Sequence, residues 1–540
     1  MASVGSTQRK RGLAALIGWW WQQRPIDFFA LHQHVRGYSF EKLGGDFKAG
    51  LNVALLAFPQ GMAYAMIAGL PIEYGIYGSA VAAVIASLFA RSRFITLGPT
   101  NATAVALGAA LLSLNIIEPE ARAAVLPLVL LMVGGMLIIG ALAGLAKAIQ
   151  YISRTVVTGY ITAAALFIIV GQMPKVLGLT LDGEVSTLAT KVIAIVKALP
   201  GTTLEPFLVS AATAILYYGL KGFRATRGLP NVAITLVVVT VLTTLVAGWL
   251  EGSGWYDPAK IATLYAVDAT AWPVTGITVD LEQMGVLADA ALGLALLCVL
   301  EGISIGKSLA ARCGARLQTD QEVYAIGMAN VGCAFLGGMP ASGSLTRSQL
   351  SFSSGGQTPV ASILTGLMLT GGVFAVGRFI QYIPVPVLSM LVITIGLSLF
   401  DRRAFRVATR ATRDDRIVFW ATFLGGVFLQ LITAIYLGAI LSIILFLRRA
   451  STPELTEFGF DESGQLAETP GTGKRSMPAI SIIHAEGDLF FGAAEIFRDQ
   501  MRRVSDDPDL KIVVCKMRNA RHVDATSIMA IEELVRYMNE

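Results

Sequence analysis

The sequence predicts an α-helical polytopic membrane protein followed by a small α/β domain. Only 15% of its 540 residues are charged and 54% are hydrophobic, whereas soluble domains carry about 25% charged residues. From about residue 47 to residue 450, apolar residues gather in successive runs of roughly 17–25 residues, the length that crosses a bilayer. After Pro478 the pattern changes to alternating strand-like and helical segments.

Fourteen apolar segments are expected to cross or enter the membrane. They lie near 47–69, 73–90, 99–114, 123–147, 153–174, 205–221, 230–250, 284–311, 320–337, 343–354, 359–378, 384–400, 414–431 and 433–448. The third and tenth are too short to cross the bilayer unaided.

The chain outside these segments forms three further parts. Residues 1–46 are expected to be a cytoplasmic or interfacial segment, because Arg9–Arg11 and Trp19–Trp21 suit the membrane surface and no signal-peptide cleavage site follows. The polar stretch 451–476 is interpreted as a linker between the transmembrane domain (47–450) and a cytosolic α/β domain (477–540). At about 60 residues, this domain is near the lower limit for an independent core, so we expect a minimal or an incomplete domain.

Charged residues in the connections predict the topology. Basic residues such as Arg91, Arg93 and Arg154 fall in alternate connections, and acidic residues such as Glu118 and Asp182 fall in the others. The positive-inside rule then places both termini in the cytoplasm, and we expect the plasma membrane or bacterial inner membrane. The exceptions on the outer side are Lys191, Lys197, Lys260 and Arg378.

An internal repeat relates the two halves of the transmembrane domain. Gln60-Gly61 in the first span and Glu301-Gly302 in the eighth are 241 residues apart, and so are Pro99 and Pro340. Since seven spans per half is an odd number, the halves must have opposite orientations. Inverted repeats with paired interrupted segments indicate a binding site near the middle of the membrane.

The stretch Gly338–Leu350 (GMPASGSLTRSQL) is the strongest candidate for one half of that site. A chain break at Pro340 is followed by a restarted helix, whose free N–H groups and positive dipole end suit an anion. Arg347 can hold an oxyanion through two hydrogen bonds. Ser344 and Thr346 offer hydroxyls, and the bare amides of Ser344 and Leu345 are expected to be available near the helix start. Helix capping and close packing are the alternative roles for the serines.

The other half of the site is expected on three other spans. Thr100, Asn101 and Thr103 follow Pro99 as the hydroxyls follow Pro340, while Gln60 and Tyr64 share one helix face. Glu301 is a carboxylate inside an apolar span, which is costly unless it is paired, hydrated or protonated. If Glu301 pairs with Arg347 in the empty site and loses that partner when substrate binds, its protonation state would change. Glu301 is therefore a candidate for proton coupling. A static ion pair with Arg347 is the alternative.

Catalysis and cofactor binding are not predicted. The sequence has no phosphate-binding GxxxxGK[ST] loop, nucleophile elbow or zinc motif. Its four cysteines and four histidines lack disulfide or metal-ligand spacing. We therefore expect no enzyme, no cofactor, no metal and no nucleic-acid partner.

These motifs resemble the SulP (sulfate permease) family of anion transporters. The matching runs are DFKAGLNVALLAFPQGMAYAMIAGLPIEYGIYGS, GPTNATAVAL, LEGISIGKSLAARCG and EVYAIGMANVGCAFLGGMPASGSLTRSQLSFSSGGQTPV. The resemblance covers roughly residues 40–450. The segment after 478 resembles the beginning of a STAS domain, with VDATS (Val523–Ser527) like its strand-to-helix turn.

The resemblance implies a seven-plus-seven inverted repeat with core and gate domains, assembled as a homodimer in the lipid membrane. It implies an anion bound between spans three and ten. The implied binding residues are Gln60, Tyr64, Thr100, Ser344, Leu345, Thr346 and Arg347. Glu301 resembles the coupling residue of members driven by H⁺ or Na⁺. Thr526 and Ser527 are weaker candidates for a regulatory phosphorylation site.

Three functions follow as hypotheses. The first is a secondary active anion transporter, H⁺-coupled, for sulfate, bicarbonate or a small dicarboxylate, with Na⁺ symport or anion exchange as variants. The second is a nucleobase permease of the same architecture, which the positive charge of Arg347 disfavours. The third is a membrane sensor or scaffold that signals through its STAS-like domain.

Overall fold

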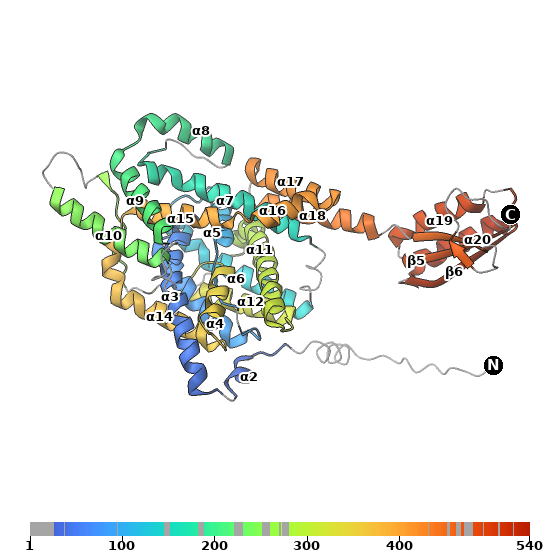
Figure 1. Ribbon diagram of the computed structural model, residues 1–540, viewed down its shortest axis with the longest axis horizontal. Helices are drawn as coiled ribbons and strands as arrows, with labels where there is room; N and C mark the ends of the chain where they lie inside the picture. Colours follow the sequence, from blue (N-terminus) through green and yellow to red (C-terminus); the bar gives the residue numbers. More distant parts are fainter. Residues whose placement is uncertain are drawn as a thin grey trace. The chain divides into compact units, whose positions relative to one another are not determined.

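The computed structural model (Figure 1) describes most of the 540 residues. The described ranges are 26–36, 38–93, 95–144, 152–181, 188–220, 231–250, 260–268, 270, 272, 280–429, 431–450, 454–460, 466–468, 479–489, 491–505, 508–521 and 523–539. The interfacial segment predicted around Trp19–Trp21 lies outside them. The chain divides into two compact units, Met1–Ala439 and Ile440–Glu540, which are described separately.

A helix occupies each of the fourteen predicted spans. In chain order these are α3 (Phe40–Ala68), α4 (Ile72–Phe89), α5 (Asn101–Ser113), α6 (Pro119–Ala143), α7 (Arg154–Leu177), α9 (Leu204–Leu220), α10 (Asn231–Leu250), α11 (Leu281–Cys313), α12 (Thr319–Phe335), α13 (Leu345–Ser353), α14 (Val360–Val376), α15 (Val385–Leu399), α17 (Arg413–Phe428) and α18 (Leu431–Ala450). Within the described residues, eight helices are long and apolar enough to cross a membrane alone, or nine with one bent pair. The helices α5 and α13 are short, as expected.

Several short helices were not predicted. They are α2 (Leu31–Val35), α8 (Leu188–Ala198), η2 (Leu199–Gly201), η5 (Gly377–Tyr382) and α16 (Arg402–Arg410). The segment Leu188–Gly201 bends by 116° against α9, as in a broken span or a re-entrant loop. These helices have too few residues to give an apolar run of spanning length.

The two halves repeat the same opening elements. The helix α3 begins at Phe40 and α11 begins at Leu281, which are 241 residues apart. This is the spacing found between Gln60 and Glu301. In each half a three-residue strand precedes the short helix, namely β1 (Leu97–Pro99) before α5 and β2 (Ala341–Gly343) before α13.

Close helix packing brings α3 and α4 together. A Cβ atom on Gly61 would lie 2.6 Å from the carbonyl oxygen of Gly75, and one on Gly75 would clash with the carbonyl oxygen of Gly61. Only glycine permits this approach, which is typical of membrane helix interfaces. The core that these two helices help to build includes Met62 of α3 and Tyr77 of α4, both almost fully buried.

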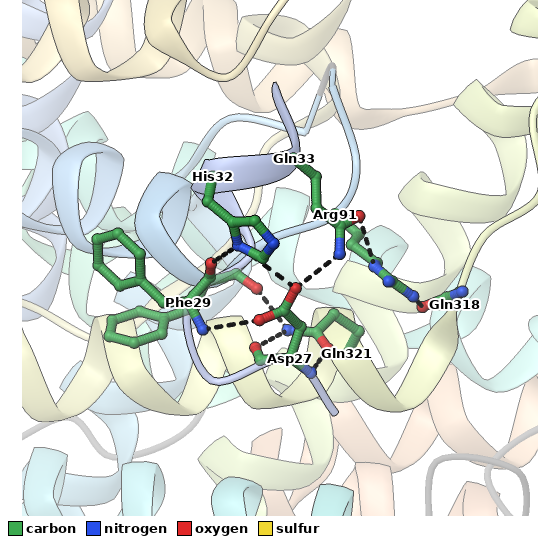
Figure 2. Close-up of polar contacts among 8 residues, drawn as sticks. Asp27, Phe29, His32, Gln33, Arg91, Gln318 and Gln321 are labelled. Atoms are coloured by element: carbon green, nitrogen blue, oxygen red, sulfur yellow. Dashed lines mark hydrogen bonds and ion pairs between the residues drawn. The ribbon is translucent and has the colours of Figure 1, made fainter. Parts of the chain in front are cut away.

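The segment before α3 ties the end of α4 to the start of α12 (Figure 2). The amide of Asp27 donates to Gln321 Oε1 at 2.8 Å, and Gln321 Nε2 donates back to the Asp27 carbonyl at 2.9 Å. Arg91, just after α4, donates to the side chains of Gln33 and Gln318. The chain leading from α4 into β1 is therefore anchored at its beginning.

The second unit contains a small mixed sheet. Its strands are β3 (Glu454–Phe460), β4 (Leu466–Glu468), β5 (Ile480–Asp488) and β6 (Ile512–Arg521), in the order β4-β3-β5-β6. Strands β5 and β6 are parallel and the other pairs are antiparallel. Helices α19 (Phe491–Ser505) and α20 (Ala525–Asn539) supply the side chains of Phe497, Met501 and Leu534 to its small core.

The interpretation of 451–476 as a linker is wrong for β3 and β4, which lie inside it. Five residues of β3, from Glu454 to Phe458, pair with β5. The polar composition of this stretch suggested a linker. An antiparallel strand can nevertheless be polar, because its backbone is hydrogen-bonded to its neighbours while one of its faces is exposed to water. The α/β domain therefore includes strand residues upstream of 477.

Candidate functional site

The two short helices start at opposite ends of one strand pair. Strands β1 and β2 run antiparallel, with Pro99 opposite Ala341 and Leu97 opposite Gly343. Asn101 begins α5 two residues after β1, and Leu345 begins α13 two residues after β2. Three strand residues span roughly 10 Å. The two positive helix ends are therefore near neighbours, as the repeat predicted.

The start of α5 is closed by a reciprocal cap. The amide of Thr103 donates to Thr100 Oγ1 at 3.2 Å, and the Thr100 amide donates to Thr103 Oγ1 at 3.0 Å. The Thr100 hydroxyl also donates to Glu301 Oε2 at 2.9 Å. Thr100 thus serves both as the cap and as the partner of the partly buried Glu301 carboxylate, so capping does not exclude a role for Thr100 in the candidate site.

The start of α13 is more open. Ser344 Oγ accepts from the Arg347 amide at 3.4 Å, so Ser344 is a helix cap. Its own amide donates to the Thr96 carbonyl at 3.2 Å, so the expectation that this amide is bare is wrong. Among the described residues no acceptor meets the amides of Leu345 and Thr346, and both residues are exposed. These two N–H groups remain available to a ligand.

Arg347 turns inward behind the strand pair. Its side chain is 1% exposed. Nη2 donates to the Pro99 carbonyl at 2.6 Å, and Nη1 donates to Ser79 Oγ of α4 at 3.4 Å. Nε has no hydrogen-bond partner among the described residues. The guanidinium is thus a positioned positive charge between the two helix starts.

Gly98 makes room for this guanidinium. A Cβ atom at position 98 would lie 2.7 Å from Nη1 and 2.9 Å from Nη2 of Arg347. Real Cβ contacts are essentially never that short, so any larger residue would displace the charge. Glycine is required at position 98 because of a contact with Arg347, 249 positions later in the chain. No local sequence pattern predicts such a contact.

Glu301 lies on α11 and faces α5. Its carboxylate is hydrogen-bonded to Thr100 and lies beside Ser342 of β2. It attracts Arg347 through space, but no ion pair joins these two described residues. The alternative of a static Glu301–Arg347 ion pair is therefore not what the structure contains.

Gln60 and Tyr64 complete the predicted set from α3. Both side chains are 4% exposed. Tyr64 lies within electrostatic reach of both Arg347 and Glu301. Gln60 Oε1 has no hydrogen-bond partner among the described residues. A buried amide without a partner is costly, so Gln60 is suited to meet a polar ligand.

Two site residues were missed by sequence reasoning. Tyr160 of α7 donates its hydroxyl to the Ala102 carbonyl at 2.9 Å and interacts electrostatically with Glu301. Asn330 of α12 holds β2 by exchanging hydrogen bonds of 2.9 Å with the backbone of Ala341. Both residues could have been found from the sequence by the feature that singled out Tyr64, namely a polar side chain within an apolar span.

The weaker regulatory candidates differ in accessibility. Thr526 is exposed. Ser527 is 1% exposed, and its hydroxyl donates to the Leu489 carbonyl at 2.8 Å and contacts Asp524 Oδ1 at 2.8 Å. Of the two, Thr526 is the one a modifying enzyme can reach without unfolding α20.

An apolar groove of about 680 Å³ lies between α3, α10 and α14. Its walls include Phe58 and Met62 but none of the predicted site residues. An anion gains nothing from such walls, so the helix starts remain the candidate site.

Comparison with known proteins places this geometry in a family. A model described as Sulfate permease family matches residues 43–422, and a model of the STAS domain matches residues 474–540. "Probable sulfate transporter MT1781" of Mycobacterium tuberculosis is 29% identical over 512 residues, covering 92% of this chain and 88% of that protein. Human "Solute carrier family 26 member 6" is 26% identical over 520 residues, covering 92% of this chain and 66% of that protein.

Solved structures share the fold. The murine anion transporter Slc26a9, in its inward-facing state, superposes with a TM-score of 0.83 at 18% identity, covering 98% of this chain and 89% of that one. The transmembrane domain of the cyanobacterial bicarbonate transporter BicA gives a TM-score of 0.62 at 18% identity, covering 75% of this chain and 98% of that one. Since the family model matches well over half of the chain, this integral multi-pass membrane protein belongs to the sulfate permease family of anion transporters and carries a STAS domain.

Proposed function

We propose that this protein is a proton-coupled secondary active transporter of an inorganic oxyanion, sulfate or bicarbonate, or of a small dicarboxylate. The observation that carries the proposal is the hydrogen bond between Thr100 and Glu301. It places a carboxylate at the start of α5, where an anion would otherwise bind. A negative Glu301 and a bound anion repel each other, so uptake of a proton by Glu301 favours anion binding.

The anion would lie between the starts of α5 and α13. The free amides of Leu345 and Thr346 would donate to it, the Thr100 and Thr346 hydroxyls would line its sides, and Arg347 would neutralise its charge from behind the strands. Gln60 Oε1 accepts hydrogen bonds and cannot donate them. Turned by an amide flip, which exchanges oxygen and nitrogen at nearly equal shape, Gln60 would donate to an oxyanion.

Oxyanions fit this donor set better than nucleobases do. The donors are backbone amides, hydroxyls and one guanidinium, all of which favour negative charge. A neutral ring would leave Arg347 without a counter-charge. The names of the relatives, a probable sulfate transporter and a bicarbonate transporter, support the same choice of substrate class, and Na⁺ coupling or exchange remain the variants to exclude.

Transport would proceed by alternating access. The hydrogen bond from Tyr160 joins α7 to the start of α5, so a movement of one helix relative to the other would change this contact. We further propose that both termini are cytoplasmic, that the chain works as a homodimer in the plasma (bacterial inner) membrane, and that Thr526 is the more accessible regulatory position of the STAS domain.

The test is uptake of labelled sulfate and bicarbonate into proteoliposomes with an imposed pH gradient. The wild-type protein should accumulate one of these anions faster when the outside is more acidic, with no effect of a Na⁺ gradient. Glu301→Gln keeps a hydrogen-bond acceptor for Thr100 but cannot change charge, so it should lose its acceleration by the pH gradient.

The matched control is Glu322→Gln, at a buried carboxylate that accepts from the Ser92 amide at 2.7 Å, away from the helix starts. It should keep its response to the pH gradient. Acceleration by Na⁺ instead of protons, or full proton coupling in Glu301→Gln, would overturn the proposed mechanism.

A further inference from the structure

Two lysines at one end of α7 form a cationic pair. The side chain of Lys175, in the last turn of α7, is exposed, and that of Lys191, in α8, is partly buried. Their ammonium groups are close enough to repel each other. Neither has a hydrogen bond or a carboxylate partner among the described residues, whereas Lys260, another lysine predicted on the outer side, is bonded to Glu205 at 3.1 Å.

The Lys191 side chain lies against α7. Its Nζ is 5.2 Å from the centroid of the Phe167 ring, and a Cβ atom on Gly171 would lie 3.4 Å from it. Gly171 and Lys175 are one helical turn apart, so both ammonium groups gather on one face of α7. The face of the Phe167 ring partly stabilises the Lys191 ammonium group. It does not offset the repulsion between the two positive charges.

The pair lies about one membrane thickness along α7 from the start of that helix. Arg154 begins α7, and Lys175 follows 21 residues later, roughly 31 Å along the helix axis. This equals the thickness of the hydrocarbon layer, about 30 Å. The neighbouring helix α8 exposes Val192, Ile193 and Val196 and bends sharply away from α9, as an interfacial helix does.

We propose that Lys175 and Lys191 bind the phosphate of an anionic phospholipid headgroup. A phosphate oxygen supplies a negative charge to both ammonium groups, each of which has three N–H donors. The exposed apolar residues of α8 meet the acyl chains of the same lipid. Lys191, one of the basic residues that depart from the predicted positive-inside pattern, is thereby given a ligand.

The proposal is tested on the full chain in nanodiscs and in detergent. Native mass spectrometry should show one retained phosphatidylglycerol in preference to phosphatidylcholine. Lys175→Gln with Lys191→Gln should lower that preference at least tenfold, whereas Lys175→Arg with Lys191→Arg should keep it. Lys197→Gln, a nearby exposed lysine of α8, is the matched control and should leave the preference unchanged.

A second pair of variants keeps both lysines. Gly171→Asp places a carboxylate beside Lys191 Nζ and should displace the lipid, whereas Gly171→Ser adds a similar volume without charge and should not. Equal retention in wild type and in Lys175→Gln/Lys191→Gln would overturn the proposal. So would thermal stabilisation by inorganic phosphate as large as that by short-chain phosphatidylglycerol, since the ligand would then be a free anion. Neither outcome depends on transport activity.

Discussion

The starts of α5 and α13 are equivalent in the repeat but differ in what they carry. At α5 a reciprocal Thr100–Thr103 cap faces the Glu301 carboxylate, and the residues at the helix start are buried. At α13 a single Ser344 cap leaves Leu345 and Thr346 exposed, with Arg347 fixed behind them. One start holds a charge that can be neutralised by a proton, and the other holds a permanent charge.

The difference between the halves is one of charge at matched positions. Gln60 and Glu301 occupy equivalent positions 241 residues apart, and an amide and a carboxylate have nearly the same shape. The repeat thus supplies two similar helix ends, and under the proposed function the carboxylate of Glu301 makes one of them proton-sensitive. Changing these charges one at a time tests whether the halves have separate roles.

The largest effect is expected from Arg347→Ala. It removes the fixed charge and leaves the Pro99 carbonyl without its donor. Truncating one member of a buried charged contact costs about 2–5 kcal/mol, so anion affinity should fall about thirtyfold or more. Equilibrium binding of labelled sulfate and bicarbonate to the purified protein measures it, with the exposed Arg316→Ala as control.

Gly98→Ala tests whether the position of the Arg347 charge matters, as distinct from its presence. The variant keeps Arg347, but its Cβ would lie 2.7 Å from Nη1, so the guanidinium must move. Anion affinity should fall in the same direction as in Arg347→Ala, by a smaller factor. If both variants bind anion as the wild type does, Arg347 is not part of the site.

An intermediate effect is expected from Gln60→Glu. A second carboxylate in the site repels the anion at neutral pH, so affinity should fall about tenfold, equivalent to about 1.4 kcal/mol. Affinity should recover as the pH is lowered and the new carboxyl group takes up a proton. Binding measured from pH 5 to pH 8 would contradict separate roles for the halves if this variant showed the same pH profile as the wild type.

The smallest effects are expected from the two caps. Thr100→Val and Ser344→Ala should each lower stability by about 1 kcal/mol, seen in thermal unfolding of the purified protein. Thr100→Val should also alter the pH dependence of anion binding, because it removes the partner of Glu301. Ser344→Ala should not. Equal changes in both pH profiles would mean that Thr100 acts only as a cap.

Sequence by itself determined the membrane class, the positions of the fourteen helical segments and the two interrupted stretches. These follow from apolar run length and from local chain breaks, which are properties of neighbouring residues. It also predicted Glu301 and Arg347 as the charges of the candidate site, because an ionisable residue within an apolar span is conspicuous. Sequence failed at 451–476, where strand pairing outweighed a polar composition.

Only the tertiary structure decided how the charges are used. Arg347 turns onto the Pro99 carbonyl and Gly98, Glu301 takes Thr100 instead of Arg347, and Tyr160 reaches α5 from another helix. Each of these contacts joins residues tens to hundreds of positions apart. Periodicity reports which face of a helix is apolar, but the partner on that face depends on how helices pack and on which hydrogen bonds remain unsatisfied once they do.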